Sequence, residues 1–351
     1  MSLIYHERPG VYSDYDASSV TAAGSTDRVI ALVGLAADAE EGLYTLTAYA
    51  SAREAFGENS ELGKMAKLAY QNGAGTILAC PVEEDTEEAY SDAFDRIFAE
   101  KKAAFCAIGS SRSDVQSALQ DAVEASSAQR GECIGIVGMT NPTKAELIAR
   151  ATLLNSERMV LVGPGVYPDG SSTAVCGGMA AAALAGVLAD QSDPAMPLNG
   201  QVLKGFSGVT GIYEDTEIDA LIRGGVTVLE CIGGKVSVMR GITTRTTTGG
   251  AQDSTFREMT TVLILDDVIP ALRSSLRSKF MRAKNNALTR NAIRNQVIVE
   301  LENRIDRQII EGYDHLTVTA DEADPTTCVV EFEFTVVHGL NRIRLTAHIS
   351  V

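Results

Sequence analysis

Short continuous apolar runs recur along the first half of the chain and predict buried β-strands. A first run covers residues 29–35 (VIALVGL), and four later runs begin 27, 29 and 26 residues apart. A stretch with helical spacing of its apolar residues separates each run from the next. Buried strands that alternate with helices are typical of a parallel sheet covered on both faces. The pattern predicts an α/β region with these four strands: 76–82 (TILACPV), 103–109 (AAFCAIG), 132–138 (ECIGIVG) and 158–163 (RMVLVG).

Caps, glycines and prolines predict several helix boundaries. Residues 59–72 carry apolar side chains at spacings of three and four, which predicts an amphipathic helix. The pair Asn141-Pro142 puts a proline where a helix begins, and Gly224-Gly225 ends a helix over 216–223.

The window 174–189 has 16 residues, mostly alanine, glycine and other apolar types, and is shorter than the ~20 residues that cross a bilayer. We therefore expect a buried helix there and no membrane insertion.

Beyond Thr243 the pattern of the chain changes. A linker rich in threonine and glycine leads into a long helical region over 256–310, which we expect to be interrupted near Pro270 and near 285–286. Strand-like alternation follows and is clearest in VEFEFTV and RIRLTAHISV. The second half therefore predicts a separate α+β module, with strands over 315–320, 328–338 and 342–351.

The first 25 residues have an apolar and aromatic cluster (IYHERPGVY) followed by polar residues without a helical period, which predicts an extended arm. The N-terminus lacks the basic start and apolar run of a signal peptide, so we expect the chain to be made and kept in the cytosol. The predicted organisation is an N-terminal arm (1–25), an α/β region (26–250), an α+β domain (251–338) and a C-terminal strand arm (339–351).

Charge is abundant and unevenly distributed. The 351 residues carry 30 Lys and Arg against 46 Asp and Glu, for a net charge of −16, and the length suits two or three domains. A net acidic chain argues against a nucleic-acid partner, because phosphate contacts need a basic surface. Residues 38–100 hold 14 acidic and 4 basic side chains, whereas 271–311 hold 9 basic and 4 acidic ones. The molecule is therefore predicted to have an acidic end and a basic end.

The basic stretch is a candidate interaction surface. Its single aromatic residue, Phe280, gives no stacking platform for nucleic acid. A basic helix that meets an acidic protein partner fits the composition better, and an ordinary solvated face is the remaining alternative. The candidate residues are Arg273, Arg277, Arg282, Arg290 and Arg294.

The α/β region lacks the residue types of common catalytic sites. A Ser-His-Asp or Cys-His group needs a histidine, and all histidines of the chain lie in the first arm or the last forty residues. The loop at 163–165 (GPG) follows a strand but matches neither GxGxxG nor GxxxxGK[ST], so a strand-to-helix turn is favoured over a phosphate site. We expect no enzyme activity and no cofactor. The histidines are His6, His315, His338 and His348.

No metal site is predicted either. The six cysteines are never closer than 26 residues, so no CxxC pair exists, and we interpret them as reduced core thiols. The acidic residues around 83–88 lack a DxDxDG loop and are better explained as a solvated loop and helix start.

Several short motifs occur in a fixed order over nearly the whole chain. They are PGVY at 9–12, LTAYASAREAFG at 46–57, GFSGVTG at 205–211, EIDALIRGGVTVLE at 217–230 and GKVSVMRGITT at 234–244. In this order they resemble the tail sheath proteins of contractile phage tails and of related particles such as R-type bacteriocins and prophage tails. The last motif departs from the resemblance at Met239, where a tryptophan is expected.

The resemblance implies a fold and a set of contacts. The implied fold is α/β, with a subtilisin-like parallel-sheet domain that lacks catalytic residues and faces outward, a smaller α+β inner domain that faces the tail tube, and extended arms. In such sheaths both arms complete small sheets in neighbouring subunits. The implied inter-subunit residues are Ile4, Pro9, Gly10, Val11 and Tyr12 in the N-terminal arm and Ile343, Leu345, Ala347 and Ile349 in the C-terminal arm.

The resemblance also implies the function. We expect a structural subunit that polymerises around a tail tube through arm exchange and contracts to drive the tube through a cell envelope. Its expected partners are other copies, the tube protein, and the baseplate and tail terminator proteins, in a virion tail assembled in the bacterial host cytoplasm. A doubly wound α/β enzyme of unknown substrate is the alternative. A binding module of the adhesin type is a third possible function. It is less favoured, because such a module needs an exposed aromatic site and only 5% of the residues are aromatic.

Overall fold

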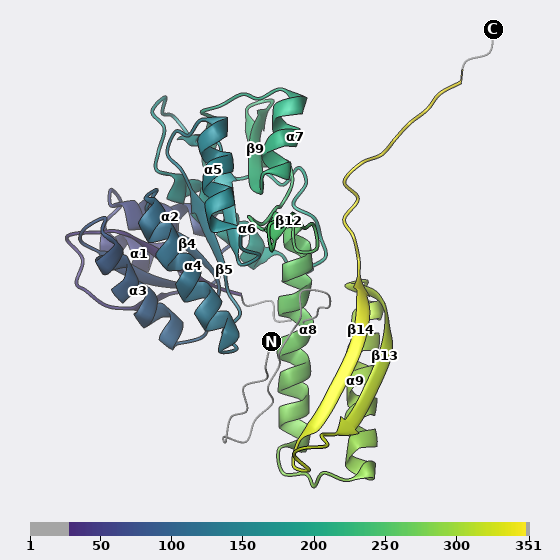
Figure 1. Cartoon of the computed structure of the whole chain (residues 1–351). Coiled ribbons are helices and arrows are strands. Elements are labelled where there is room, and N and C mark those ends of the chain that lie inside the picture. Colours follow the sequence, from purple (N-terminus) through teal and green to yellow (C-terminus); the bar gives the residue numbers. More distant parts are fainter. Residues whose placement is uncertain (1–27, 349–351) are drawn as a thin grey trace.

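The computed structural model describes residues 28–348, which are built around one eight-stranded sheet (Figure 1). The strand order is β10-β9-β6-β5-β4-β1-β3-β2. The strands from β9 to β3 run parallel, and β10 and β2 are antiparallel at the two edges. The strands are β1 (Val29–Leu35), β2 (Tyr44–Leu46), β3 (Ile77–Val82), β4 (Ala103–Ile108), β5 (Ile134–Gly138), β6 (Met159–Gly163), β9 (Val226–Ile232) and β10 (Lys235–Val238). The predicted parallel sheet is thus confirmed, with strand bounds within two residues of expectation.

Helices cover both faces of the sheet. One face packs against α1, α2 and α6, and the other against α3, α4, α5 and α7, so that two hydrophobic clusters enclose the strands. This layering explains why the strand sequences are apolar throughout rather than alternating. The helices are α1 (Tyr49–Phe56), α2 (Glu61–Gln71), α3 (Glu87–Ala99), α4 (Ser113–Ala128), α5 (Lys144–Leu154), α6 (Gly177–Asp190) and α7 (Asp215–Arg223). We call residues 28–258 the α/β body.

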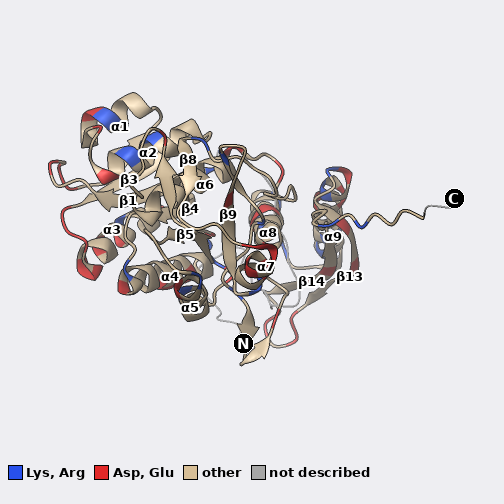
Figure 2. Cartoon of the chain, turned by 90° about the horizontal axis from the view of Figure 1, so that it is seen from above, with Lys and Arg blue, Asp and Glu red and all other residues tan. Residues whose placement is uncertain are grey.

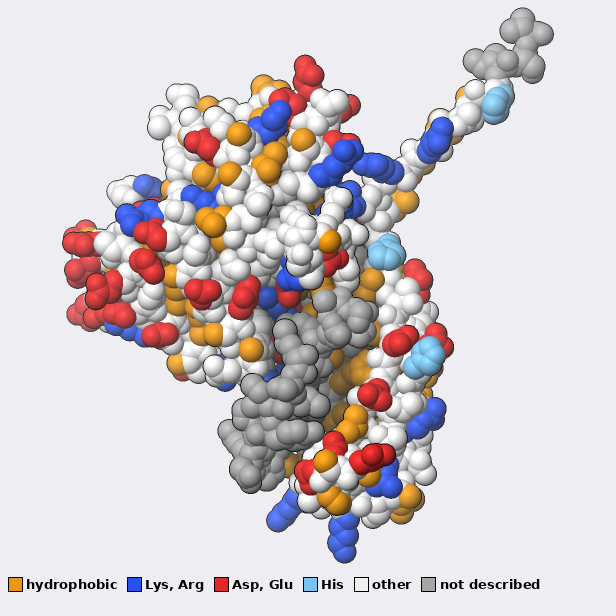
Figure 3. Space-filling model, viewed as in Figure 1, with side chains coloured by type: hydrophobic (Ala, Val, Ile, Leu, Met, Phe, Trp, Pro, Cys, Tyr) orange, Lys and Arg blue, Asp and Glu red, His pale blue; other side chains and the backbone are white. Residues whose placement is uncertain are grey.

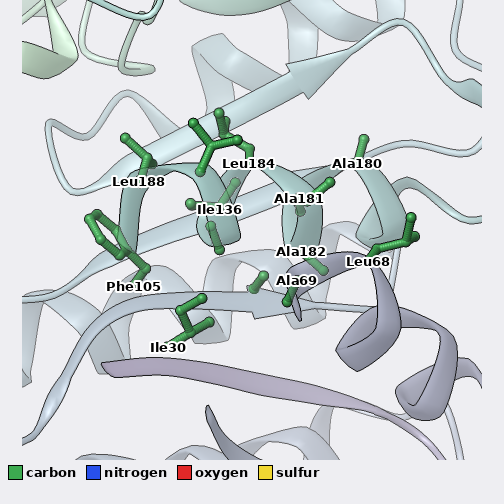
Figure 4. Close-up of a cluster of buried hydrophobic side chains, with 14 of the residues drawn as sticks. Ile30, Leu68, Ala69, Phe105, Ile136, Ala180, Ala181, Ala182, Leu184 and Leu188 are labelled. Carbon is green, nitrogen blue, oxygen red and sulfur yellow. The ribbon is translucent and has the colours of Figure 1, made fainter. Parts of the chain in front are cut away.

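Helix α6 is enclosed by protein on all sides. Its residues from Gly177 to Ala189 are all buried, which confirms the buried helix expected at 174–189. Figure 4 shows its alanine and leucine side chains between the strands, at Ile30 and Phe105, and helix α2. Alanine allows this close approach on both sides at the packing density of a protein interior.

A second body lies beside the sheet and consists of two long helices and a β-hairpin. Helix α8 (Met259–Phe280) and helix α9 (Ala287–Asp306) pack side by side, and β13 (Ile310–Ala320) and β14 (Cys328–Val336) form a two-stranded antiparallel sheet against α9. We call residues 259–336 the helical body (Figure 1). The first turns of α8 still contribute to the α/β core, so α8 joins the two bodies. The short strands β7 (Val166–Pro168) with β8 (Phe206–Val209) and β11 (Thr247–Thr248) with β12 (Ala251–Gln252) complete the described structure.

One expectation about the second half was wrong. Helix α8 continues through Pro270, because the buried side chains of Val268 and Leu272 on either side hold it against its neighbours; the break falls at 281–286 only. Residues 342–348 pair with no other described strand of the chain, and the pairing of this arm with a neighbouring subunit stays a prediction. Two boundaries also shift. Helix α5 begins after the N-cap Thr143 rather than at Pro142, and β13 begins at Ile310 rather than at 315.

Candidate assembly interface

The carboxyl ends of the central strands are filled by protein. In doubly wound sheets, ligands bind at this edge. Here the first residues of α6 occupy it: a Cβ atom on Gly177 would lie 2.1 Å from the carbonyl carbon of Gly138, and one on Gly178 would lie 2.3 Å from the carbonyl oxygen of Ile108. Glycine is therefore required where α6 meets the ends of β4 and β5.

Glu61 fills the neighbouring part of the same edge. Its carboxylate accepts a hydrogen bond of 3.2 Å from the backbone N–H of Leu35 and leaves no room for a side chain at Gly109. Burial, reinforced by Glu61, raises the pKa of the Cys176 thiol to about 12. Burial also raises the pKa of the Tyr90 hydroxyl. Both groups stay protonated at neutral pH, so Cys176 is no thiolate nucleophile.

The β13-β14 hairpin has two unlike faces. The inward face of β14 packs Val330, Phe332, Phe334 and Val336 against the helices. The outward face carries Glu331 and Glu333, which are exposed and lie opposite Thr317 and Asp314 of β13. This division follows directly from the alternation of VEFEFTV.

The two edges of the hairpin also differ. Among the described residues, β13 and β14 pair only with each other. The register shifts between Ile310 and Gly312 and again between Asp314 and Thr317, and His315 has φ +53°. The extra residues of both shifts lie on β13, so β13 is bulged, whereas β14 runs continuously over nine residues. Bulges disfavour pairing along a strand edge.

The C-terminal segment leaves the hairpin as an exposed chain. Residues 340–348 are all exposed, with 83% of Ile343 and 89% of Leu345 accessible to solvent, and Ala347 lies in the same exposed stretch. Its first residues touch the α/β body, where the Asn199 amide donates a hydrogen bond of 2.7 Å to the Asn341 side chain. Figure 1 shows the rest of the segment running away from both bodies. Ile349 and the N-terminal candidates Ile4, Pro9, Gly10, Val11 and Tyr12 lie outside the described residues.

The five candidate arginines do not form one surface. Arg273 is mostly buried and pairs with Glu132 of the α/β body at 2.7 Å. Arg290 is half-buried and donates a hydrogen bond of 2.8 Å to the side chain of Asn285. Arg277, Arg282 and Arg294 are exposed on the outer part of the helical body. The exposed three are the ones available to a partner.

Acidic side chains gather at the opposite end of the molecule. Figure 2 and Figure 3 show them on the loops and helices around α1 and α3. They include the exposed stretch 83–88, as its solvated composition predicts. Residues 28–348 contain no group of three or more His, Cys, Asp or Glu side chains suited to hold a metal ion. None of the helices within this range is long and apolar enough to cross a membrane.

Buried ion pairs join the two bodies, and the sequence did not predict them. Arg158, 2% exposed, precedes β6 and pairs with Asp266 of α8, while Glu132 before β5 pairs with Arg273 one heptad further along α8. In the first pair the arginine belongs to the α/β body, and in the second it belongs to α8. This reversal of charge fixes the position of α8 along the amino ends of the strands. The only signal in the sequence is the acidic pair at 266–267 inside an apolar helix.

Asp267 is the least well paired member of this junction. It is 2% exposed, and its Oδ2 atom lies 4.0 Å from Nε of Arg304 without a hydrogen bond among the described residues. Burial raises its pKa to about 6, against the opposing effect of Arg307, Arg304 and Arg28. The junction therefore holds a carboxyl group that titrates in a mildly acidic range.

Comparison with known proteins gives a consistent result. Residues 83–244 match the phage tail sheath protein central domain, and residues 251–350 match the phage tail sheath C-terminal domain. The tail sheath protein of Mycobacterium phage Bxz1 is 28% identical over 311 residues, covering 83% of this chain and 52% of that protein. That of Bacillus phage SP01 is 26% identical over 281 residues, covering 79% and 48%. The chain thus spans about half the length of these curated relatives.

The fold is also found in a solved assembly. The structure of the anti-feeding prophage helical sheath in its contracted state matches with a TM-score of 0.73 and 17% identity, covering 99% of this chain and 100% of that one. At this identity the likeness concerns the fold, including its mixed α/β architecture with a largely parallel sheet.

Proposed function

The chain belongs to the phage tail sheath family, and we propose that it is a structural subunit of a contractile tail sheath. Subunits polymerise around a tail tube through exchange of their arms, and contraction of the polymer drives the tube through a cell envelope. One observation carries this proposal: the same chain holds a two-stranded sheet whose edges pair with no other described strand, and an exposed extended segment with strand-like alternation. An edge strand presents backbone N–H and C=O groups without a strand partner, and strand addition from another copy satisfies them.

The partners follow from this role. The subunit binds other copies in stacked rings, and the polymer contacts a tube protein, a baseplate and a tail terminator. Assembly takes place in the bacterial host cytoplasm, and the product is part of a virion tail. Among the candidate arginines we assign the tube-facing role to Arg277, Arg282 and Arg294, because these three are exposed.

We further propose that the α/β body is a subtilisin-like domain without catalytic residues. The parallel sheet with helices on both faces and the buried α6 support this. The proposed division is an arm at 1–25, an outer region at 26–250, an inner domain at 251–338 and an arm at 339–351. Family matches that divide between 244 and 251 support the second boundary.

A doubly wound α/β enzyme, the alternative function, is not supported. The curated relatives are tail sheath proteins, and α6 and Glu61 fill the strand ends where such enzymes bind substrate. The sequence also lacks the GxxxxGK[ST] phosphate loop. We therefore propose that contraction draws its free energy from a metastable packing of subunits that relaxes to a more stable one.

Electron microscopy of the purified chain tests the function. The expected result is rings or tubes with a helical lattice, and deletion of residues 339–351 should abolish them while circular dichroism shows an intact fold. Polymers that form equally well without residues 339–351 and without 1–25 would contradict arm exchange. A chain that stays monomeric with its tube protein at high concentration would contradict the sheath function itself.

A further inference from the structure

The C-terminal arm and the outer edge of β14 have matching patterns of charge and apolar residues. In an extended arm, Ile343, Leu345 and Ala347 point to one side. Arg342 and Arg344 then point to the other side, two residues apart. Strand β14 repeats the same division.

On β14 the side chains of Val330, Phe332, Phe334 and Val336 face the helices, and Glu331 and Glu333 face outward with the same two-residue spacing. An arm that pairs with β14 and turns Ile343 and Leu345 inward extends the apolar row of Phe332 and Phe334. The same orientation sets both arginines beside both glutamates, because directly opposed side chains of neighbouring strands are about 5 Å apart. Only one of the two faces of the arm satisfies both conditions.

The structure also favours β14 over β13 as the edge that receives the arm. Both register shifts add residues to β13, and His315 breaks its extended backbone with φ +53°. Strand β14 offers nine consecutive residues without an added one. A bulged edge pairs poorly with an incoming strand, and a regular edge pairs well.

We infer that a charge code sets the face and register of the arm. It consists of Arg342 and Arg344 of one copy and of Glu331 and Glu333 on the β14 edge of a second copy. This inference rests on the proposed function and adds which edge and which side chains give self-recognition. A one-residue slip of the arm would turn its arginines toward the apolar row and its apolar residues toward solvent. The code therefore selects the correct register by penalising the wrong one.

Among the residues that the structure describes, the two glutamates have only weak partners in their own chain. The Glu333 carboxylate lies 3.2 Å from Nδ1 of His315, with both side chains more than 65% exposed. The Thr317 hydroxyl lies 3.3 Å from the Glu331 carboxylate. In the arm, the Arg342 guanidinium lies 3.5 Å from the Asp219 carboxylate, with 76% of its side chain exposed. Such exposed contacts contribute little to the stability of the chain, so the four charged side chains are available to a second copy.

Two charge-reversed chains test the code. The arm-reversed chain carries Arg342→Glu and Arg344→Glu, and the edge-reversed chain carries Glu331→Arg and Glu333→Arg. In each chain like charges meet when a copy binds its own kind, so we expect the critical concentration for polymerisation to rise at least about tenfold at low ionic strength. An equimolar mixture should polymerise like the wild type, because each arm then meets an edge of opposite charge.

The controls separate this inference from the proposed function. A chain with Lys64→Glu and Lys235→Glu, two exposed lysines of the α/β body, carries the same change in net charge as the arm-reversed chain and should polymerise normally. Circular dichroism establishes that both reversed chains fold. Folded reversed chains that each polymerise like the wild type, or a mixture that fails to recover, would overturn the charge code and leave arm exchange intact. Polymers that persist when residues 339–351 and residues 1–25 are deleted would overturn arm exchange.

A peptide of residues 339–351 gives a second readout that needs no polymer. Fluorescence anisotropy with the full-length chain should detect binding of the natural peptide. The edge-reversed chain should bind it at least about tenfold more weakly and should prefer a peptide with both arginines changed to glutamate. Equal affinity of both peptides for both chains would contradict the inference.

Discussion

The α/β body and the helical body use their strands in opposite ways. In the α/β body, helices cover both faces of the sheet, and α6 closes the strand ends on protein. In the helical body, one face of the β13-β14 sheet packs against the helices, and among the described residues nothing covers the other face, which carries Glu331 and Glu333. The first body buries both faces of its sheet within its own chain, and the second has a strand edge that pairs with no other described strand. A polymer whose subunits stay linked while they move needs both a rigid body and a strand edge that another chain can bind.

We expect the largest loss of stability when an ion pair between the two bodies is broken. Changing Arg158→Met leaves Asp266 as a buried carboxylate without its arginine and should lower the free energy of unfolding by about 3–5 kcal/mol. The double change Arg158→Met with Asp266→Leu should recover most of the loss, because it removes both charges. Chemical denaturation of the two variants measures this. Equal destabilisation by both would contradict the role of the ion pair.

A second prediction compares a glycine from each body. A Cβ at Gly178 would lie 2.3 Å from the backbone of β4, whereas Gly312 of β13 has no atom within 4 Å of its added Cβ. Gly178→Ala should therefore destabilise the chain by about 3 kcal/mol through overpacking, and Gly312→Ala should change stability by less than about 0.5 kcal/mol. Thermal unfolding of the two variants checks the difference. Similar melting temperatures would show that the strand ends are less tightly filled than described.

The junction also predicts a pH dependence with a definite sign. The pKa of Asp267 is raised to about 6 in the folded chain, so its contribution to stability is complete below its ordinary pKa of 3.8 and is lost as pH rises through about 6. Between pH 8 and pH 5 the wild type should gain about tenfold in folding equilibrium constant relative to Asp267→Asn. Denaturation at both pH values measures this difference. Asp306→Asn, which removes an exposed carboxylate of α9, is the matched control and should give no such difference.

The smallest expected effect concerns the root of the C-terminal arm. Asp219→Ala removes the exposed ion contact with Arg342 and should change the free energy of unfolding by less than about 0.5 kcal/mol. Thermal unfolding of this variant, set beside Arg158→Met, contrasts an exposed pair with a buried one. A loss above about 1 kcal/mol would mean that the arm is fixed to its own subunit.

The parallel sheet could be predicted because its strands are continuous apolar runs, and the run at 29–35 matches β1 residue for residue. Local rules failed where tertiary packing decided the outcome. Pro270 predicts a break, yet the buried neighbours Val268 and Leu272 hold α8 together. Residues 342–348 have strand-like alternation but no partner strand among the described residues.

The ion pairs of the junction could not be predicted either, because they join residues far apart in the sequence. Arg158 and Asp266 are separated by 108 positions, and Glu132 and Arg273 by 141. Neither separation leaves a pattern in a single sequence. Glu331 and Glu333 were visible in the alternation of VEFEFTV, but their place beside a regular strand edge depends on the bulges of β13.

A cryo-electron microscopy map of the assembled polymer would show whether the arm of one copy binds another copy. We expect density for residues 340–349 of one subunit as a strand along the β14 edge of another, with Arg342 and Arg344 on the side of Glu331 and Glu333. A map in which the β14 edge of every subunit has no strand from another copy would contradict this expectation.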